Sequence, residues 1–165
     1  MRARRMKSIA FAVGAAVMGG IFVVGPVAMI ALNRRLDWPT WESRVSAIIG
    51  GFLILGGIAL LAYCSRLFDR FGGGTPVPLQ PPSQLVTAGV YRYSRNPIYV
   101  GDLAILFGLF LHRGELALLL YALAIAAGLQ VWVVVHEEPT LQQRFGHEFS
   151  AYSARVPRWI GWPRA

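Results

Sequence analysis

Four long apolar segments constrain this sequence more than any other feature. They lie at about residues 8–32, 45–63, 97–111 and 116–135. A helix needs about 20 residues to cross the hydrocarbon core of a bilayer, and the first, second and fourth segments reach that length. The third is shorter and contains Asp102, and we expect it to cross if its helix starts at Pro97. The pattern predicts an all-α integral membrane protein with about four transmembrane helices.

The composition favours the same class. Hydrophobic residues make up 55% of the 165 positions, and the mean hydropathy of +0.49 is high for a soluble domain of this size. A net charge of +8 would suggest nucleic acid in a soluble protein, but here the basic residues lie between apolar segments. We therefore expect a lipid bilayer as partner and no nucleic acid. The single cysteine excludes an intrachain disulfide, and the three histidines lack a convincing partner set for a metal.

The basic residues also predict the topology. The N-terminal tail, the loop over residues 65–96 and the C-terminal tail contain four lysines or arginines each, twelve in all, whereas the other two loops together contain four. This bias predicts a multi-pass protein of the cell membrane with both termini cytoplasmic. The first segment resembles a signal peptide, but it is long and no small-x-small cleavage site precedes Asn33, so we interpret it as a membrane helix. We expect residues 1–165 to form one domain.

Two cytoplasmic segments follow from this topology. The loop over residues 65–96 is rich in glycine and proline but carries regularly placed apolar and aromatic residues, so we expect an ordered lid or binding loop rather than a floppy linker. Pro139 is well placed to open a helix over residues 139–156. We predict that this amphipathic helix lies on the membrane or folds back over the loop. Its apolar stripe consists of Leu141, Phe145, Phe149, Tyr152 and Val156.

Charged and aromatic residues gather where the third and fourth apolar segments meet the cytoplasm. The stretch YRYSRNPIYVGDL, residues 91–103, begins the third segment, and Glu137 and Glu138 end the fourth. Ionisable groups at this depth are usually functional, and together they suggest a polar pocket with both signs of charge. A zwitterionic ligand that contains a purine would use all of it. Asp102 faces this pocket or a neighbouring arginine, and we favour an ion pair with the arginine.

Two motifs extend this picture to a family. LVTAGVYRYSRNPIYVG, followed by EEP-x-L-x-x-x-FG-x-x-x-x-x-Y-x-x-x-V-P-R, resembles the isoprenylcysteine carboxyl methyltransferases and is similar to the related phospholipid N-methyltransferases. The resemblance covers roughly residues 82–159, about half of the chain. It implies membrane helices with a cytoplasmic pocket for S-adenosylmethionine, which the C-terminal segment closes. It also implies a lipophilic acceptor that enters from the bilayer, with S-adenosylhomocysteine as product.

The resemblance implies a set of site residues. Cofactor contacts are expected at Gln84, Leu85, Val86, Tyr91, Arg95, Asn96, Pro97, Ile98, Tyr99 and Glu137. The family usually has histidine where this chain has Asn96. The prenylcysteine enzymes have an arginine where this chain has Val133, so we expect a free prenylcysteine carboxylate to be a poor substrate. The candidate catalytic residues, as proton acceptors or as replacements for that arginine, are His136, Glu138 and Arg144.

The preferred function is methyl transfer from S-adenosylmethionine to a lipophilic or membrane-embedded carboxylate, thiol or amine. The sulfonium is already activated, so transfer needs mainly proximity and alignment. A carboxylate acceptor needs no base, whereas an amine or thiol must lose a proton, which His136 or a glutamate could accept. Two alternatives remain open at this point: a small four-helix membrane transporter, and a lipid reductase of similar architecture with a nicotinamide cofactor.

Overall fold

The computed structural model describes residues 17–68, 70 and 84–164. Within this part of the chain the fold is all-α, and the only β feature is an isolated bridge between Thr40 and Glu115. Three helical stretches are long and apolar enough to cross a membrane: Val17–Arg35, Arg44–Leu67 and Leu116–Arg155. The prediction of an all-α membrane protein is thus confirmed. The first nine residues of the expected first segment, residues 8–16, lie outside the described residues.

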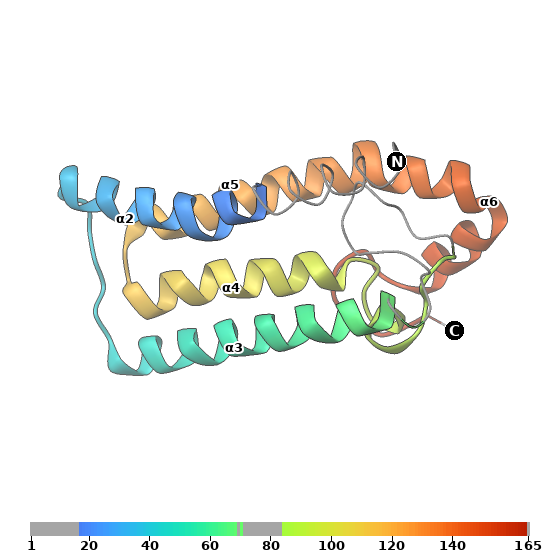
Figure 1. The fold of residues 1–165 in the computed structure, drawn as a ribbon, viewed down its shortest axis with the longest axis horizontal. Coiled ribbons are helices and arrows are strands. Elements are labelled where there is room, and N and C mark those ends of the chain that lie inside the picture. The colour runs from blue at the N-terminus through green and yellow to red at the C-terminus, as the bar shows by residue number, and fades with distance from the viewer. Residues whose placement is uncertain (1–16, 69, 71–83, 165) are drawn as a thin grey trace, which may run out of the picture.

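The helices form an antiparallel bundle (Figure 1). A π-helical turn η1 (Gly20–Val24) leads into α2 (Gly25–Arg35), and α3 (Arg44–Leu67), α4 (Pro97–Arg113) and α5 (Leu116–Trp132) follow. In the bundle α3 packs on α4, α4 on α5, and α5 on α2. Helix α4 has 17 residues, slightly fewer than a membrane span needs. It packs between α3 and α5 and so completes the bundle of α2, α3, α4 and α5.

Glycines allow α3 and α4 to approach closely. A methyl group built on Gly57 of α3 would lie 2.6 Å from the carbonyl oxygen of Gly101 on α4. One built on Gly108 of α4 would lie 2.8 Å from the carbonyl oxygen of Gly50. Gly50 and Gly57 are seven residues apart on α3, and Gly101 and Gly108 are seven residues apart on α4, so the two helices face each other along a seam of small residues. Such seams are typical of membrane helix pairs, where packing rather than the hydrophobic effect holds helices together.

The expected break before the last helix is absent. The π-helical turn η4 (Val133–Glu137) joins α5 directly to α6 (Glu138–Arg155), so Leu116–Arg155 is one helical run of 40 residues. Pro139 does lie in the first turn of α6, where the proline ring needs no amide hydrogen. Pro139 thus lies in the first turn of the last helix, as predicted, and this helix follows α5 through η4 without a break.

The last helix bends at Gly146. Its backbone there has φ 50° and ψ −120°, a conformation that glycine adopts far more readily than other residues. Gln142 and Ser150 donate side-chain hydrogen bonds of 3.1 and 3.2 Å to the Gly146 carbonyl oxygen, which the bend exposes. The bend turns the second half of α6 back over the loop (Figure 1). Of the two predicted positions for this amphipathic segment, folding back over the loop is the one observed.

The apolar stripe of α6 becomes a small core. Phe149, Tyr152 and Val156 are buried together, and Leu141, Phe145 and the loop residue Leu85 pack against them. A second core lies beneath the loop at the end of α3, where Cys64, Leu67 and Phe68 pack with Val86 and Tyr91. The two cores fix the described part of the loop, residues 84–96, between α3 and α6. Below, this end of the bundle is the loop end, and the end with residues 36–43 and 114–115 is the turn end.

Candidate functional site

Hydrogen bonds join the loop to the C-terminal segment, and each of the two segments donates to the other. The Tyr152 hydroxyl donates to the carbonyl oxygen of Tyr91 at 2.7 Å. The Arg95 amide donates to the carbonyl oxygen of Pro157 at 3.0 Å, and the Gly161 amide donates to that of Tyr93 at 3.1 Å. These backbone groups would otherwise lie unsatisfied in a partly buried loop. The contacts hold the C-terminal segment across the loop end of the bundle.

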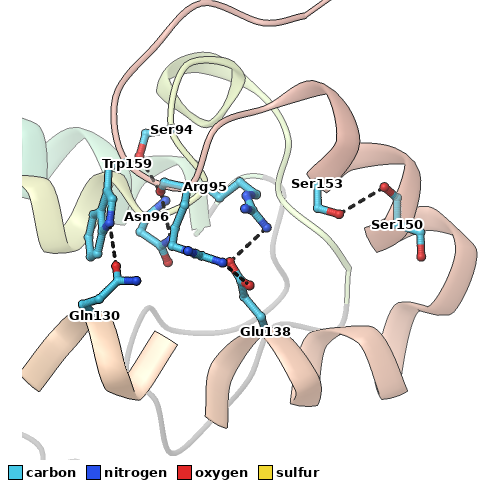
Figure 2. A network of polar contacts seen from close by, with 9 residues as sticks. Ser94, Arg95, Asn96, Gln130, Glu138, Ser150, Ser153 and Trp159 are labelled. Atoms are coloured by element: carbon cyan, nitrogen blue, oxygen red, sulfur yellow. Dashed lines mark hydrogen bonds and ion pairs between the residues drawn. The ribbon is translucent and has the colours of Figure 1, made fainter. Parts of the chain in front are cut away.

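Asn96 belongs to this junction. The residue is buried, its Nδ2 donates to the carbonyl oxygen of Arg158 at 3.0 Å, and its amide donates to Oγ of Ser94 at 3.0 Å (Figure 2). It precedes Pro97, the first residue of α4. The asparagine therefore ties the start of α4 to the C-terminal segment, a role that needs a hydrogen-bond donor and no charge.

Glu138 forms the centre of an ion-pair network with two arginines. Nε and Nη2 of Arg158 donate to its two carboxylate oxygens at 2.7 and 2.9 Å, and Nη1 of Arg95 lies 3.0 Å from Oε1 (Figure 2). The bidentate geometry is the strong form of an arginine–carboxylate pair. Hydrogen bonding to Glu138 raises the pKa of Arg158, whereas burial lowers the pKa of the Arg95 guanidinium. Two guanidinium groups share one carboxylate, so the network keeps a net positive charge.

Glu137 has a different partner from its neighbour. Its Oε2 accepts a hydrogen bond of 2.8 Å from the Tyr99 hydroxyl of α4. Among the described residues, no basic side chain forms an ion pair with Glu137, although the carboxylate is mostly buried. The π-turn η4 ends at Glu137. Such turns often occur at functional sites because the extra residue redirects the side chains. Two adjacent glutamates thus point to two different sets of partners.

The residues around these carboxylates include unsatisfied hydrogen-bonding capacity. Nε of Arg95 is buried and has no hydrogen-bond partner among the described residues. Buried polar atoms are rarely left unpaired in a folded protein, so such an atom commonly marks a place for a ligand or water. The site therefore offers Nε of Arg95 as a donor for an anion and the carboxylate of Glu137 as an acceptor for a cation.

The phospholipid methyltransferase family model matches residues 45–148. The match runs from the start of α3 into α6 and includes Arg95, Tyr99, Glu137 and Glu138. The chain belongs to the phospholipid methyltransferase family. It is therefore a membrane methyltransferase. No curated protein and no solved structure matches this chain.

Most of the predicted cofactor residues of this membrane methyltransferase lie at the loop end. Val86, Tyr91 and Ile98 pack on the end of α3, and Leu85 packs on α6. Their apolar side chains form the base under the polar residues. Gln84, at the start of the described loop, is exposed. The remaining residues predicted to contact the cofactor provide the polar groups and the first turn of α4: Arg95, Asn96, Pro97, Tyr99 and Glu137.

The three predicted catalytic residues lie in different surroundings. Glu138 lies in the ion-pair network, where its carboxylate binds the guanidinium groups of Arg95 and Arg158. His136 is exposed and its ring lies against Trp132, with 4.3 Å between ring centroids. Arg144 is exposed, with its guanidinium over the ring of Phe145. No hydrogen bond or ion pair connects Arg144 to Glu137 or Glu138 in the described part of the chain.

Three residues at the site were not predicted from the sequence. Arg158 provides the bidentate partner of Glu138, and Trp159 Nε1 donates to Oε1 of Gln130 on α5 at 2.8 Å (Figure 2). Arg158 is part of the V-P-R motif, so the signal for it was present. Gln130 is a lone polar residue in an apolar span, and that is the signal that could have found it.

Within the part of the chain that the structure describes, the predicted ion pair of Asp102 is absent. The residue is 5% exposed, none of the ion pairs within the described residues involves it, and its Oδ1 has no hydrogen-bond partner there. It lies one helical turn after Tyr99 on α4, deeper in the bundle than the arginines of the loop. The arginines bind Glu138 instead, because the helical run of α5, η4 and α6 brings that carboxylate to them.

Proposed function

We propose that this membrane methyltransferase uses S-adenosylmethionine and transfers the methyl group to a lipophilic acceptor that enters from the bilayer. The site is the loop end of the bundle, around Arg95, Tyr99 and Glu137. One observation carries the proposal: Glu138 is neutralised by two arginines, whereas the mostly buried Glu137 has a neutral tyrosine as partner. A carboxylate kept without a cation inside a partly desolvated site is suited to a cationic or hydroxyl-bearing ligand.

The residues present fit the two charges of the cofactor's amino-acid end. The unpaired Nε of Arg95 can donate to a carboxylate, and Glu137 can accept from an ammonium group or from ribose hydroxyls. The apolar base formed by Val86, Tyr91 and Ile98 suits a purine or a methylene chain. When bound, S-adenosylmethionine supplies a methyl group already activated by a sulfonium. The chain's task is then to position both reactants and to exclude water.

The C-terminal segment provides the exclusion of water. Asn96 connects it to the loop by donating to the carbonyl oxygen of Arg158, the Arg158 side chain connects it to Glu138 of α6, and Trp159 connects it to Gln130 of α5. Closing a site in this way strengthens the electrostatic contacts inside it. We propose that Glu138 acts as a positioning residue, because it holds both Arg95 and Arg158 in place. This role follows from its bidentate contact and needs no change of protonation.

Val133 limits which chemical class of methyl acceptor the site can bind. The residue is fully buried in the first position of the π-turn, so no charged clamp for a substrate carboxylate exists there. An amine or thiol acceptor must lose a proton, and we propose His136, next to Glu137 in the chain, as the group that passes it to solvent. Its exposed ring is open to exchange. A prenylcysteine carboxylate is expected to be methylated slowly compared with the best acceptor.

The topology is part of the proposal. The loop end, which carries the site, is placed in the cytoplasm together with both chain termini, because the cofactor is cytoplasmic and the basic residues are concentrated on this side. Reporter fusions after Ala165 and within residues 36–43 should report opposite sides of the membrane. Reports from the same side would refute the four-helix topology.

Binding of S-adenosylhomocysteine tests the cofactor assignment directly. Titration calorimetry on the purified full chain in detergent should show saturable binding, and Glu137→Gln should weaken it strongly. Glu148→Gln is the matched control, because Glu148 is an exposed glutamate on the same helical run. A screen of amine, thiol and carboxylate lipids with a radiolabelled methyl donor then identifies the acceptor. Absence of binding to the folded parent protein would refute the proposal.

A further inference from the structure

The turn end of the bundle contains a polar hollow that the proposed methyl transfer does not use. Its volume is ≈ 780 Å³, and it is a wide hollow open to the surface rather than an enclosed cavity. The loop before α3, the start of α3 and the turn between α4 and α5 provide its walls. The lining residues are Arg34, Thr40, Glu42, Ser43, Arg44, Ala47, His112, Arg113 and Glu115.

Hydrogen bonds fix the walls of this hollow. The buried Asn33 donates from Nδ2 to the carbonyl oxygen of Trp38 at 3.0 Å and accepts at Oδ1 from the amide of Ala117 at 3.0 Å. The Trp41 amide donates to the carbonyl oxygen of Gly114 at 2.9 Å. On the other wall, Ser46 donates to the carbonyl oxygen of Leu111 at 2.7 Å. The connecting loop is thus fixed to the turn between α4 and α5, and the hollow is a built feature of the fold.

The hollow is positively charged. Arg34, Arg44 and Arg113 line it, against the two carboxylates of Glu42 and Glu115. Within the described residues, neither Arg34 nor Arg44 forms an ion pair. Their guanidinium groups are therefore available to a phosphate, which arginine recognises well because its planar fork matches the phosphate oxygens.

Glu115 favours a ligand that also carries a positively charged hydrogen-bond donor. Only 4% of it is exposed, its Oε1 pairs with Nη2 of Arg113 at 3.2 Å, and its Oε2 has no hydrogen-bond partner among the described residues. A buried carboxylate oxygen without a donor is costly, so a donor is expected from a ligand. An ammonium group supplies both the hydrogen and the compensating charge. The hollow therefore presents donors for a phosphate and one acceptor for an ammonium.

We propose that this hollow binds the headgroup of a phospholipid that carries a phosphodiester and a primary ammonium. The arginines bind the phosphate and Glu115 binds the ammonium. A trimethylammonium headgroup has no N–H to donate, so it satisfies the arginines but not Glu115. The place of the hollow favours a lipid over a soluble ion, because it lies at helix ends beside Trp38 and Trp41, the residue type that settles at the membrane surface.

The test is a lipid titration of the full chain in detergent. Short-chain phospholipids with phosphoethanolamine and phosphocholine headgroups are compared, with inorganic phosphate as a third ligand, by native mass spectrometry and calorimetry. The parent protein should bind the phosphoethanolamine lipid about tenfold more tightly than the phosphocholine lipid. Glu115→Gln should abolish that preference. Arg44→Gln should weaken both lipids several-fold, and Arg66→Gln, an exposed arginine at the other end of α3, should change neither.

A phospholipid could also occupy the proposed transfer site, so total lipid binding does not decide the outcome. The headgroup preference of the parent protein and its change in the variants decide it. Equal affinity of the parent for the two headgroups would overturn the proposal. So would an effect of Arg44→Gln no larger than that of Arg66→Gln. If inorganic phosphate binds as tightly as the lipids, the site is one for a free anion. S-adenosylhomocysteine binding measured on the same samples keeps this result separate from the proposed methyl transfer.

Discussion

The hydroxyl of Tyr99 donates a hydrogen bond of 2.8 Å to Oε2 of Glu137, and this contact joins the first turn of α4 to the π-turn after α5. The two residues are 38 positions apart in the chain. Their pairing leaves Glu137 without a cationic partner, while the adjacent Glu138 receives two. The division between a ligand-binding carboxylate and a structural one rests on this arrangement.

Glu137→Gln should weaken S-adenosylhomocysteine binding by about 30- to 1,000-fold, because it removes a charge that a partly desolvated ligand group needs, a loss of about 2–4 kcal/mol. Tyr99→Phe should have a smaller effect, about tenfold, since it removes one hydrogen bond to the carboxylate and leaves the charge. Calorimetry gives both values, and a thermal-shift assay checks folding. Parent-like binding by Glu137→Gln would place the cofactor elsewhere.

Replacing Glu138 should destabilise the closed C-terminal segment. Glu138→Gln leaves the Arg95 and Arg158 guanidinium groups close together without their shared carboxylate, and we expect a loss of about 1–3 kcal/mol. Arg158→Gln should lose less, because Arg95 still pairs with Glu138. Thermal unfolding and limited proteolysis of the C-terminal segment measure the effect, with Arg155→Gln, an exposed arginine nearby, as control. If the order of the two effects is reversed, Glu138 is not the centre of the network.

The glycine seam predicts a sharp contrast between neighbouring positions. Gly57→Ala should destabilise the bundle by about 1–3 kcal/mol, because the added methyl would meet the backbone oxygen of Gly101, which cannot move cheaply. Gly56→Ala should be neutral or slightly stabilising, since nothing lies within 4 Å of its added methyl and alanine favours the helix. Thermal unfolding in the same detergent compares the two. Equal effects would mean that α3 and α4 do not pack through these glycines.

Two buried polar residues should respond in opposite ways. Asp102→Asn should leave thermal stability unchanged or raise it by about 1 kcal/mol, because Asp102 has no ion-pair partner among the described residues and the amide carries no charge. Asn33→Ala should lower stability by about 2–3 kcal/mol, because it leaves the carbonyl oxygen of Trp38 and the amide of Ala117 unpaired. A clear loss of stability in Asp102→Asn would indicate a partner that stabilises the carboxylate.

The length and hydropathy of the apolar segments were enough to predict the class and the helices. The second and third apolar segments lie within α3 and α4, which reach a few residues further, to Leu67 and Arg113. The fourth lies within the helical run Leu116–Arg155, and the described part of the first, residues 17–32, is helical. The apolar spacing in α6 also predicted its buried face, because side chains three and four residues apart share one side of a helix. These features are local, so they can be read from a single segment.

The sequence by itself determined the class, the order of the helices and the end of the bundle where charged and aromatic residues gather. Only the tertiary structure decided which partners the carboxylates have. Glu137 and Glu138 are adjacent and chemically equal in the sequence, and the π-turn directs one to Tyr99 and the other to Arg95 and Arg158. The glycine seam, the unpaired Asp102 and the polar hollow at the turn end likewise depend on contacts between segments far apart in the chain. Hydrophobicity sets where each helix lies in the membrane, but pairing between polar groups depends on the relative rotation of the helices, which no single segment contains.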